Sequence, residues 1–163
     1  MAELNDSMRE FLSGCHYATL ATFNEGGSIH LTPVWYLLEN DRFYVSTGSS
    51  ARKAKNILER HEVSIMVDSR RAQGDERWVS AVGTAEIISG EKSKEINSKI
   101  LSRYLTQAAL DDPRVGPGFA AAGEATICVT PNSWQSWEFS SVDNNFFGGI
   151  LGQDPDKWFK AVD

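Results

Sequence analysis

Between residues 43 and 56 the chain reads Phe43-Tyr44-Val45-Ser46-Thr47-Gly48-Ser49-Ser50-Ala51-Arg52-Lys53-Ala54-Lys55-Asn56, and its hydrophobic pattern changes at Gly48. The residues before Gly48 are mostly aromatic or β-branched and favour a strand. After Gly48, apolar residues recur at helical spacing as far as Leu58. The stretch therefore predicts a strand, a tight turn at Gly48 and a helix over Ser49–Arg60.

Strand patterns lie on both sides of this stretch. Asn24-Glu25-Gly26-Gly27 is a turn sequence between two runs rich in β-formers, and together they predict a β-hairpin. A polar loop, Asp68–Glu76, separates two later runs. The expected strands are Tyr17–Phe23, Ser28–Leu38, Phe43–Thr47, Val63–Val67, Trp78–Ile88, Ala125–Val129 and Asn132–Phe139.

Helical patterns are fewer. Ser7-Met8-Arg9-Glu10 has the spacing of a capping box, and Gly14 can end this first helix in a left-handed conformation. A further helix is expected over Ser89–Leu105, and a loop over Asp111–Gly118.

Strands joined mostly by tight turns favour a six- to seven-stranded antiparallel barrel, mainly β with flanking helices (α+β), over a doubly wound parallel sheet. No internal repeat or linker divides the chain, so residues 1–163 are expected to form one domain. The tail from about 141 to 163 carries aromatic residues without a strong period.

The overall charge is acidic, because 22 Asp and Glu against 16 Lys and Arg give a net charge of -6. Such a surface repels polyanions, so general nucleic-acid binding is not expected. Cys15 and Cys128 are far apart in sequence, and no long apolar run follows Met1. These features predict a cytoplasmic protein with no signal peptide and no membrane span.

The helix expected after Gly48 has an unusual order of charges. Arg52, Lys53 and Lys55 stand in its first turns, where the helix dipole is already positive, and Glu59 stands near its end. A bound anion would make this order favourable, because backbone N–H groups, the preceding serine hydroxyls and the cations would all contact it. The same pattern also fits a solvated helix face with its basic side chains in water.

Four stretches, taken in order, resemble the pyridoxamine 5'-phosphate oxidase-like superfamily of split β-barrel flavoproteins. They are His30–Tyr36, Tyr44–Thr47, Ser50–Ile57 and Val63–Val67. The likeness is strongest to the small single-domain branch that uses FMN or a deazaflavin coenzyme, and it extends over about Phe11 to Ile88. The resemblance implies an FMN-binding split β-barrel and a homodimer with the cofactor at the subunit interface.

The resemblance also implies which residues contact the cofactor. The strand Leu31–Trp35 would lie against the flavin ring, largely through main-chain groups, and Trp35 is the aromatic residue expected to stack on the ring. Arg52 and Lys53 match the phosphate-binding basic pair of the family. Trp78 stands where related oxidases carry the glutamine of an Arg-Gln-Val run. The implied cofactor-binding residues are His30, Leu31, Thr32, Pro33, Val34, Trp35, Ser46, Thr47, Ser49, Ser50, Arg52, Lys53, Asn56 and Trp78.

The chain departs from true pyridoxamine phosphate oxidases at Trp134–Phe139, which lacks their arginine and histidine motif for the substrate phosphate. The expected function is an oxidoreductase that binds FMN, with a deazaflavin coenzyme as the alternative, and acts on another small molecule. FMN is favoured because it is the more widespread cofactor. Hydride transfer is chemistry of the flavin itself, so no catalytic side chain is expected.

A non-catalytic flavin or haem carrier, store or sensor of the same fold is the alternative from another class. His16, His30 and His61 are the only histidines, and their spacing matches no metal signature, so no metal site is expected.

Overall fold

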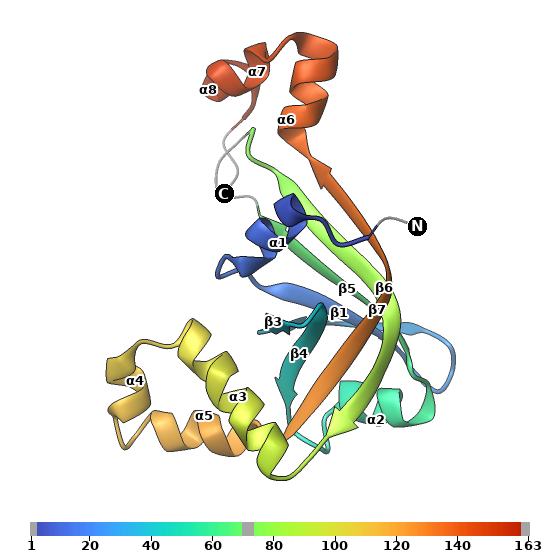
Figure 1. Cartoon of the computed structure of the whole chain (residues 1–163), viewed down its shortest axis with the longest axis vertical. Helices are drawn as coiled ribbons and strands as arrows, with labels where there is room; N and C mark the ends of the chain where they lie inside the picture. The colour runs from blue at the N-terminus through green and yellow to red at the C-terminus, as the bar shows by residue number, and fades with distance from the viewer. Residues whose placement is uncertain (1–2, 70–73, 161–163) are drawn as a thin grey trace.

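The described residues form a seven-stranded antiparallel sheet with helices at its edges, as seen in a computed structural model of the chain (Figure 1). The structure describes residues 3–69 and 74–160, so the middle of the predicted loop Asp68–Glu76 lies outside the described residues. The strand order is β2-β1-β5-β6-β7-β4-β3. The strands are β1 (Ala18–Phe23), β2 (Ile29–Val34), β3 (Leu37–Glu39), β4 (Arg42–Thr47), β5 (Glu62–Ser69), β6 (Arg77–Ile88) and β7 (Ala125–Glu138). The α+β, antiparallel prediction is confirmed.

The sheet curls into a split barrel because its two edge strands are joined by a very short connection. β2 lies at one edge and β3 at the other, and only Trp35 and Tyr36 separate them in the chain. A flat sheet would hold these edges roughly 29 Å apart, at six spacings of about 4.8 Å. The connection spans at most roughly 11 Å, so the two edges must approach each other. The prediction of one strand over Ser28–Leu38 was therefore wrong at this break.

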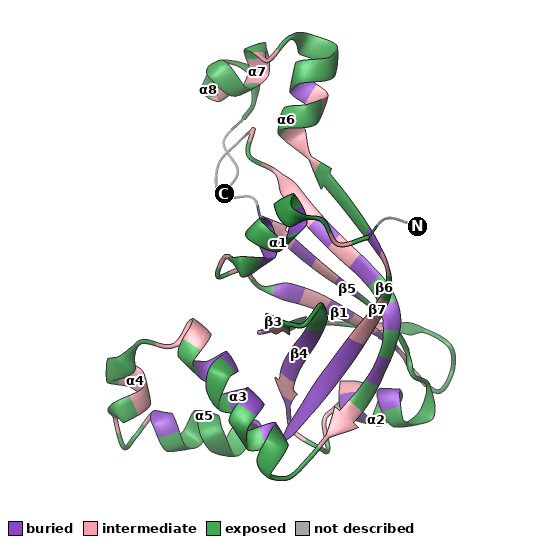
Figure 2. Ribbon diagram, viewed as in Figure 1, coloured by how far each residue is buried: buried purple, intermediate pink, exposed green. Residues whose placement is uncertain are grey.

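Alternating side chains of the strands fill the inside of the curl. Tyr36 and Phe43 are the largest wholly buried side chains, with ring centroids 5.5 Å apart. The Tyr36 hydroxyl donates to the Leu12 carbonyl at 2.8 Å. Leu12 belongs to α1 (Asp6–Ser13), whose Met8 and Phe11 are also buried in this core. Figure 2 shows the buried residues concentrated along β4, β5 and β7.

α1 begins and ends differently from the prediction. Asn5 caps it, because the Asn5 side chain accepts from the Met8 N–H at 2.9 Å. Ser7, the predicted cap, instead accepts from the Arg77 guanidinium through its hydroxyl and its carbonyl. Gly14 has a φ of -64°, so the left-handed helix end predicted there was also wrong.

A bulge bends the long ribbon of β6 and β7. The register shifts between Val82 and Gly83. A Cβ on Gly83 would lie 2.1 Å from the carbonyl oxygen of Thr130 and 2.8 Å from the Cα of Pro131, so only glycine fits. β7 is continuous here, whereas the sequence predicts two strands divided near Pro131, because the bulge accommodates the proline without ending the strand.

Between β6 and β7 the chain forms a helical excursion of α3 (Glu91–Tyr104), α4 (Gln107–Asp111) and α5 (Gly116–Ala122). α3 packs on β4 and β7, and it confirms the helix predicted over Ser89–Leu105. The predicted loop over Asp111–Gly118 is only partly a loop, since α5 begins at Gly116. Pro117 lies in the first turn of α5, where proline removes no helical hydrogen bond.

The C-terminal tail stands beyond one end of the β6–β7 ribbon (Figure 1). It forms α6 (Phe139–Val142), the π-helix η1 (Asp143–Phe147), α7 (Ile150–Gln153) and α8 (Pro155–Trp158). The buried Asp143 carboxylate accepts from the Leu151 N–H at 3.1 Å and the Gly152 N–H at 2.7 Å, which fixes these short turns. Within residues 3–69 and 74–160, no helix has the length and apolar character needed to cross a membrane.

Candidate functional site

A turn and the helix α2 (Arg52–Glu59) follow β4, as the change of hydrophobic pattern predicts. The Ala51 N–H donates to the Gly48 carbonyl at 3.1 Å and closes the turn. Ala54 and Ile57 are buried and fix the helix against the sheet. The helix has no side-chain cap and no acidic residue in its first turn. Its own sequence therefore supplies no counter-charge at its positive end.

A cavity of about 340 Å³, here called the β2–α2 cavity, lies where the curl brings the end of β2 close to β4 and α2. Five of the residues implied by the family resemblance line it: Pro33, Val34, Trp35, Ser46 and Lys53. The structure thus brings these five residues together, and their contact with a cofactor stays a prediction. The other lining residues are Tyr17, Leu101, Phe119, Ala122 and Gly123.

Trp35 is held in an aromatic stack at the wall of the β2–α2 cavity. Its ring lies 4.9 Å from the Tyr104 ring at an angle of 3°, and 5.6 Å from the Phe119 ring at 21°. The Tyr104 hydroxyl donates to the His16 carbonyl at 2.6 Å and accepts from the Tyr36 N–H at 3.2 Å. These contacts fix the indole on protein rings, and its stacking on a flavin ring stays a prediction.

Lys53 is a half-buried cation in the same cavity. Its ammonium has no hydrogen bond or ion pair to any residue that the structure describes. Desolvation lowers the pKa of Lys53 below its ordinary value. A half-buried, unpaired charge costs free energy, so an anion bound beside Lys53 would make this position favourable.

The other basic residues of α2 face a second cavity. Ser50, Arg52 and Lys55 line a cavity of about 900 Å³ on the side of the turn between β1 and β2. The two basic residues of the predicted phosphate pair therefore point to different cavities, Arg52 to the second and Lys53 to the β2–α2 cavity.

Asn56 has a structural role in this arrangement. It is buried, and its amide donates to the Thr22 hydroxyl at 3.0 Å and to the Asn24 side chain at 3.2 Å. These bonds hold α2 against the end of β1. Both amide hydrogens of Asn56 are used in these two bonds. A contact between Asn56 and a cofactor stays a prediction.

Both hydrogen-bond donors of Ser49, in the turn before α2, are bonded to Glu124. Its N–H donates to the Glu124 carboxylate at 2.9 Å, and its hydroxyl donates to the same oxygen. These bonds lower the pKa of Glu124. The neighbouring Thr47 is buried, and its hydroxyl donates to the Gly48 carbonyl at 3.3 Å.

β2 presents an edge of the sheet beside the cavity. The Thr32 hydroxyl lies 2.8 Å from the Nε2 atom of His30 on one face of the strand, while Leu31 and Pro33 are exposed on the other. β2 pairs only with β1 among the described strands. Its outer main-chain groups are therefore available to a ligand or another chain, as the resemblance implies for this strand.

Trp78 does not join the other predicted residues within one chain. It lies at the start of β6, paired with Asp68 on β5 and Trp137 on β7. The end of α2 leads into β5 at Glu62, opposite Thr84 of β6. Trp78 is roughly 20 Å further along the strand, at about 3.3 Å per residue. Its contact with a cofactor stays a prediction.

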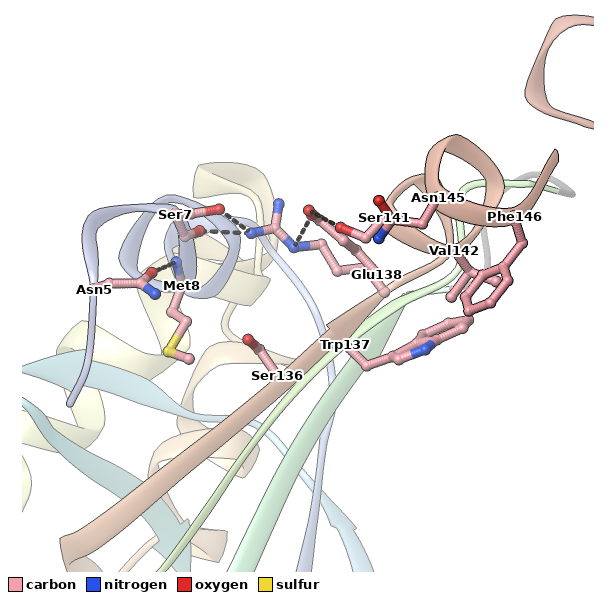
Figure 3. Close-up of a pocket in the computed structure, with 11 residues that line it drawn as sticks. Asn5, Ser7, Met8, Ser136, Trp137, Glu138, Ser141, Val142, Asn145 and Phe146 are labelled. Carbon is pink, nitrogen blue, oxygen red and sulfur yellow. Dashed lines mark hydrogen bonds and ion pairs between the residues drawn. The ribbon is translucent and has the colours of Figure 1, made fainter. Parts of the chain in front are cut away.

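A third cleft, of about 410 Å³, lies at that end of the ribbon between α1 and α6 (Figure 3). The Arg77 guanidinium there donates to Ser7 and lies 3.7 Å from the Glu138 carboxylate. Figure 3 shows Ser7 on one side of this cleft and Glu138 on the other. The Arg77 cation is thus already paired. We place the candidate functional site at the β2–α2 cavity instead, because the Lys53 cation there has no ionic partner among the described residues.

The histidines lie apart from one another. His16 stacks on Phe11 at 4.6 Å, His30 is on β2, and His61 follows α2. No group of three or more His, Cys, Asp and Glu suited to a metal ion occurs among residues 3–69 and 74–160.

The sequence did not indicate Tyr104, Phe119, Gly123 and Glu124 as site residues. They belong to the helical excursion and the link that follows it, beyond the strongest part of the family resemblance. The only mark of this link in the sequence is Gly123 itself. A Cβ on Gly123 would lie 2.2 Å from the Ser46 hydroxyl oxygen, so the link passes very close to β4. The aromatic contacts depend on long-range packing and carry no local pattern.

The curled antiparallel sheet with flanking helices defines a split β-barrel fold. The family model described as pyridoxamine 5'-phosphate oxidase matches residues 4–138. The chain therefore belongs to the pyridoxamine 5'-phosphate oxidase family, which confirms the resemblance seen in its sequence.

Solved structures have the same fold. The conserved hypothetical protein Rv2991 from Mycobacterium tuberculosis is 21% identical, with a TM-score of 0.69 over 87% of this chain and 88% of that one. A structure named F420 reductase is 20% identical, with a TM-score of 0.63 over 83% and 98%. General stress protein 26 from Bacillus anthracis is 18% identical, with a TM-score of 0.60 over 83% and 94%. At these identities the likeness shows the fold alone. A search of curated proteins found no match.

Proposed function

We propose that the chain is an oxidoreductase that binds FMN at the β2–α2 cavity, with the cofactor phosphate beside Lys53. The observation that carries this proposal is the Lys53 ammonium, half-buried and without an anionic partner among the described residues. A phosphate monoester would supply the missing negative charge. The apolar lining from Pro33, Trp35 and Phe119 suits the aromatic part of the same molecule.

The chain's own residues would bind and orient this cofactor. Lys53 neutralises the phosphate, and the stack of Trp35 on Tyr104 and Phe119 gives the cavity a rigid wall that excludes water. When bound, the flavin supplies hydride or electron transfer to a small-molecule substrate. No side chain is assigned as an acid or base.

A deazaflavin coenzyme is the alternative cofactor, because it also carries a phosphate that Lys53 would contact. A similar fold in a structure named F420 reductase supports keeping this alternative. FMN remains the first choice as the more widespread cofactor.

The proposal includes a homodimer with the cofactor site at its interface. Tyr17, Ile29 and Leu31 are exposed at 64%, 62% and 63%, although they are large and apolar. Tyr17 precedes β1 and lines the β2–α2 cavity, while Ile29 and Leu31 lie on β2, the edge strand that leads to it. An exposed apolar patch at an unpaired sheet edge is typical of a protein interface, and a second copy there would also close the cavity.

The experiment that tests the function is a titration of the purified full chain with FMN and with the deazaflavin coenzyme, followed by fluorescence. Saturable binding of one of them is expected, and absence of binding by both would contradict the proposal. Turnover with a reduced nicotinamide and a panel of acceptors then separates an oxidoreductase from a non-catalytic carrier.

A further inference from the structure

The Glu124 carboxylate already uses the donors that a bound phosphate would need at the start of α2. One oxygen of Glu124 accepts both the N–H and the hydroxyl of Ser49. Ser49 lies one turn before Lys53, and Glu124 directly follows Gly123, which lines the β2–α2 cavity. The carboxylate is therefore held at the border of the proposed phosphate site.

The position suits a negative charge, and the charge comes from outside α2. The first turn of α2 contains no acidic residue. Glu124 reaches it from the link between α5 and β7 and provides the counter-charge that the helix dipole favours. The two hydrogen bonds lower the pKa of Glu124, so it is ionised at neutral pH.

Glu124 is also free to leave this position. Its side chain is exposed, so little packing opposes a change of rotamer. It lines an open cavity of about 770 Å³ behind α5, and the exposed Lys94 lines the same cavity. A displaced carboxylate would have room there, and the Lys94 ammonium, which already donates to the Glu91 carboxylate at 2.7 Å, stands at the same cavity. The Lys53 ammonium donates no hydrogen bond to Glu124 in this position.

We infer that Glu124 is an internal competitor for the anionic end of the ligand, an inference that rests on the proposed function. Each Ser49 donor makes one strong hydrogen bond, so a phosphate oxygen that takes these donors must displace the carboxylate, which also repels it. A ligand that contacts Lys53 as well as Ser49 gains an ion pair that Glu124 does not make. Glu124 thus weakens the binding of any ligand whose anionic end takes the Ser49 donors, and it leaves a neutral end unaffected, because a neutral end has no need to displace it.

Glu124→Gln, which keeps the side-chain shape and removes the charge, tests this role. The full-length variant is expected to bind FMN about threefold to tenfold more tightly than the wild type, since an exposed charged contact is worth little more. Riboflavin, which has no phosphate, should bind both proteins equally. Glu124→Ala should act in the same direction, and Glu10→Gln on α1 is the matched control that should leave both affinities unchanged.

Unchanged or weaker FMN binding by Glu124→Gln, with saturable binding by the wild type, would overturn the competitor role and leave the proposed function standing. Equal tightening of FMN and riboflavin would overturn it too. A parallel titration with inorganic phosphate tests the competitor role separately, in case the proposed binding of FMN is wrong. If FMN does not bind but Glu124→Gln still strengthens phosphate binding, the competitor role stands alone. If neither ligand binds either protein, both are contradicted.

Discussion

At the scale of single residues, burial decides which protonation state the fold prefers. The Tyr36 hydroxyl lies in the core and donates to the Leu12 carbonyl, and burial raises the pKa of Tyr36. Burial acts on Lys53 in the opposite direction and lowers its pKa. Both shifts favour the neutral form. Tyr36 is neutral at physiological pH in any case, whereas Lys53 needs a partner to be charged at low cost.

Tyr36→Phe is expected to reduce the alkaline loss of stability. The unfolded chain ionises this tyrosine near its ordinary pKa of about 10, whereas the folded chain keeps the proton to a higher pH. The free energy of unfolding therefore falls as pH rises above about 10. The variant has no hydroxyl to ionise at this position. At neutral pH its free energy of unfolding should be about 1 kcal/mol below that of the wild type, and this difference should shrink above pH ~10. Urea unfolding of both proteins across this range measures it, and a constant deficit would contradict the account.

At the scale of elements, α2 is the helix that positions the site, and its anchor is its buried face. Ile57 is wholly buried, while the adjacent Leu58 is exposed at 63%. The two side chains have the same number of carbon atoms and opposite surroundings. They therefore form a matched pair for measuring how strongly α2 is held.

Ile57→Ala is expected to lower the free energy of unfolding by about 2 to 4 kcal/mol, because it leaves a cavity between α2 and the sheet. Leu58→Ala should change it by less than about 0.5 kcal/mol. Chemical denaturation of the two variants beside the wild type checks the difference. Similar losses in both variants would mean that α2 does not pack as described.

The elements that the sequence predicts well are those set by local pattern. β4, the turn at Gly48 and α2 follow from a change of hydrophobic period, and α3 follows from its own amphipathic spacing. The break at Trp35 and Tyr36 has no local signal, since both residues favour strands and closure of the sheet causes the break. The helix cap moved from Ser7 to Asn5 because both residue types cap helices well.

The candidate site divides in the same way. Lys53 and the end of β2 were predictable from motif order, which chain connectivity preserves. Phe119 and Glu124 were not, because they reach the site only through the packing of α5 on α3 and the close passage of its link beside β4. Arg52 was predicted to share a phosphate with Lys53, yet successive residues of a helix point about 100° apart, and the two line different cavities.

At the scale of the whole molecule, the curl of the sheet leaves one apolar edge uncovered. The core is enclosed by the strands and α1, yet large apolar side chains on β2 remain exposed. In the proposed dimer these side chains are buried by a second copy. The cofactor site and the dimer interface would then form a single region.

Leu31→Asp is expected to convert a dimer of the 18.1 kDa chain into a monomer, because it places a charge in the proposed interface. Leu58→Asp, at the same exposure on α2, is the matched control and should leave the mass unchanged. Sedimentation equilibrium of the three proteins measures this. A monomeric wild type, or a dimeric Leu31→Asp variant, would contradict the proposed interface.

The most direct test of the central claim compares FMN and riboflavin binding by Lys53→Ala. Lys55→Ala is the control, since Lys55 lies on the same helix and lines the other cavity. If Lys53 binds the cofactor phosphate, its removal should weaken FMN binding about tenfold to a hundredfold, because a charge-assisted contact is worth about 1.5 to 3 kcal/mol. Riboflavin binding by Lys53→Ala, and FMN binding by Lys55→Ala, should change little. Equal losses of FMN and riboflavin, or no loss of FMN, would contradict the assignment of the phosphate to Lys53.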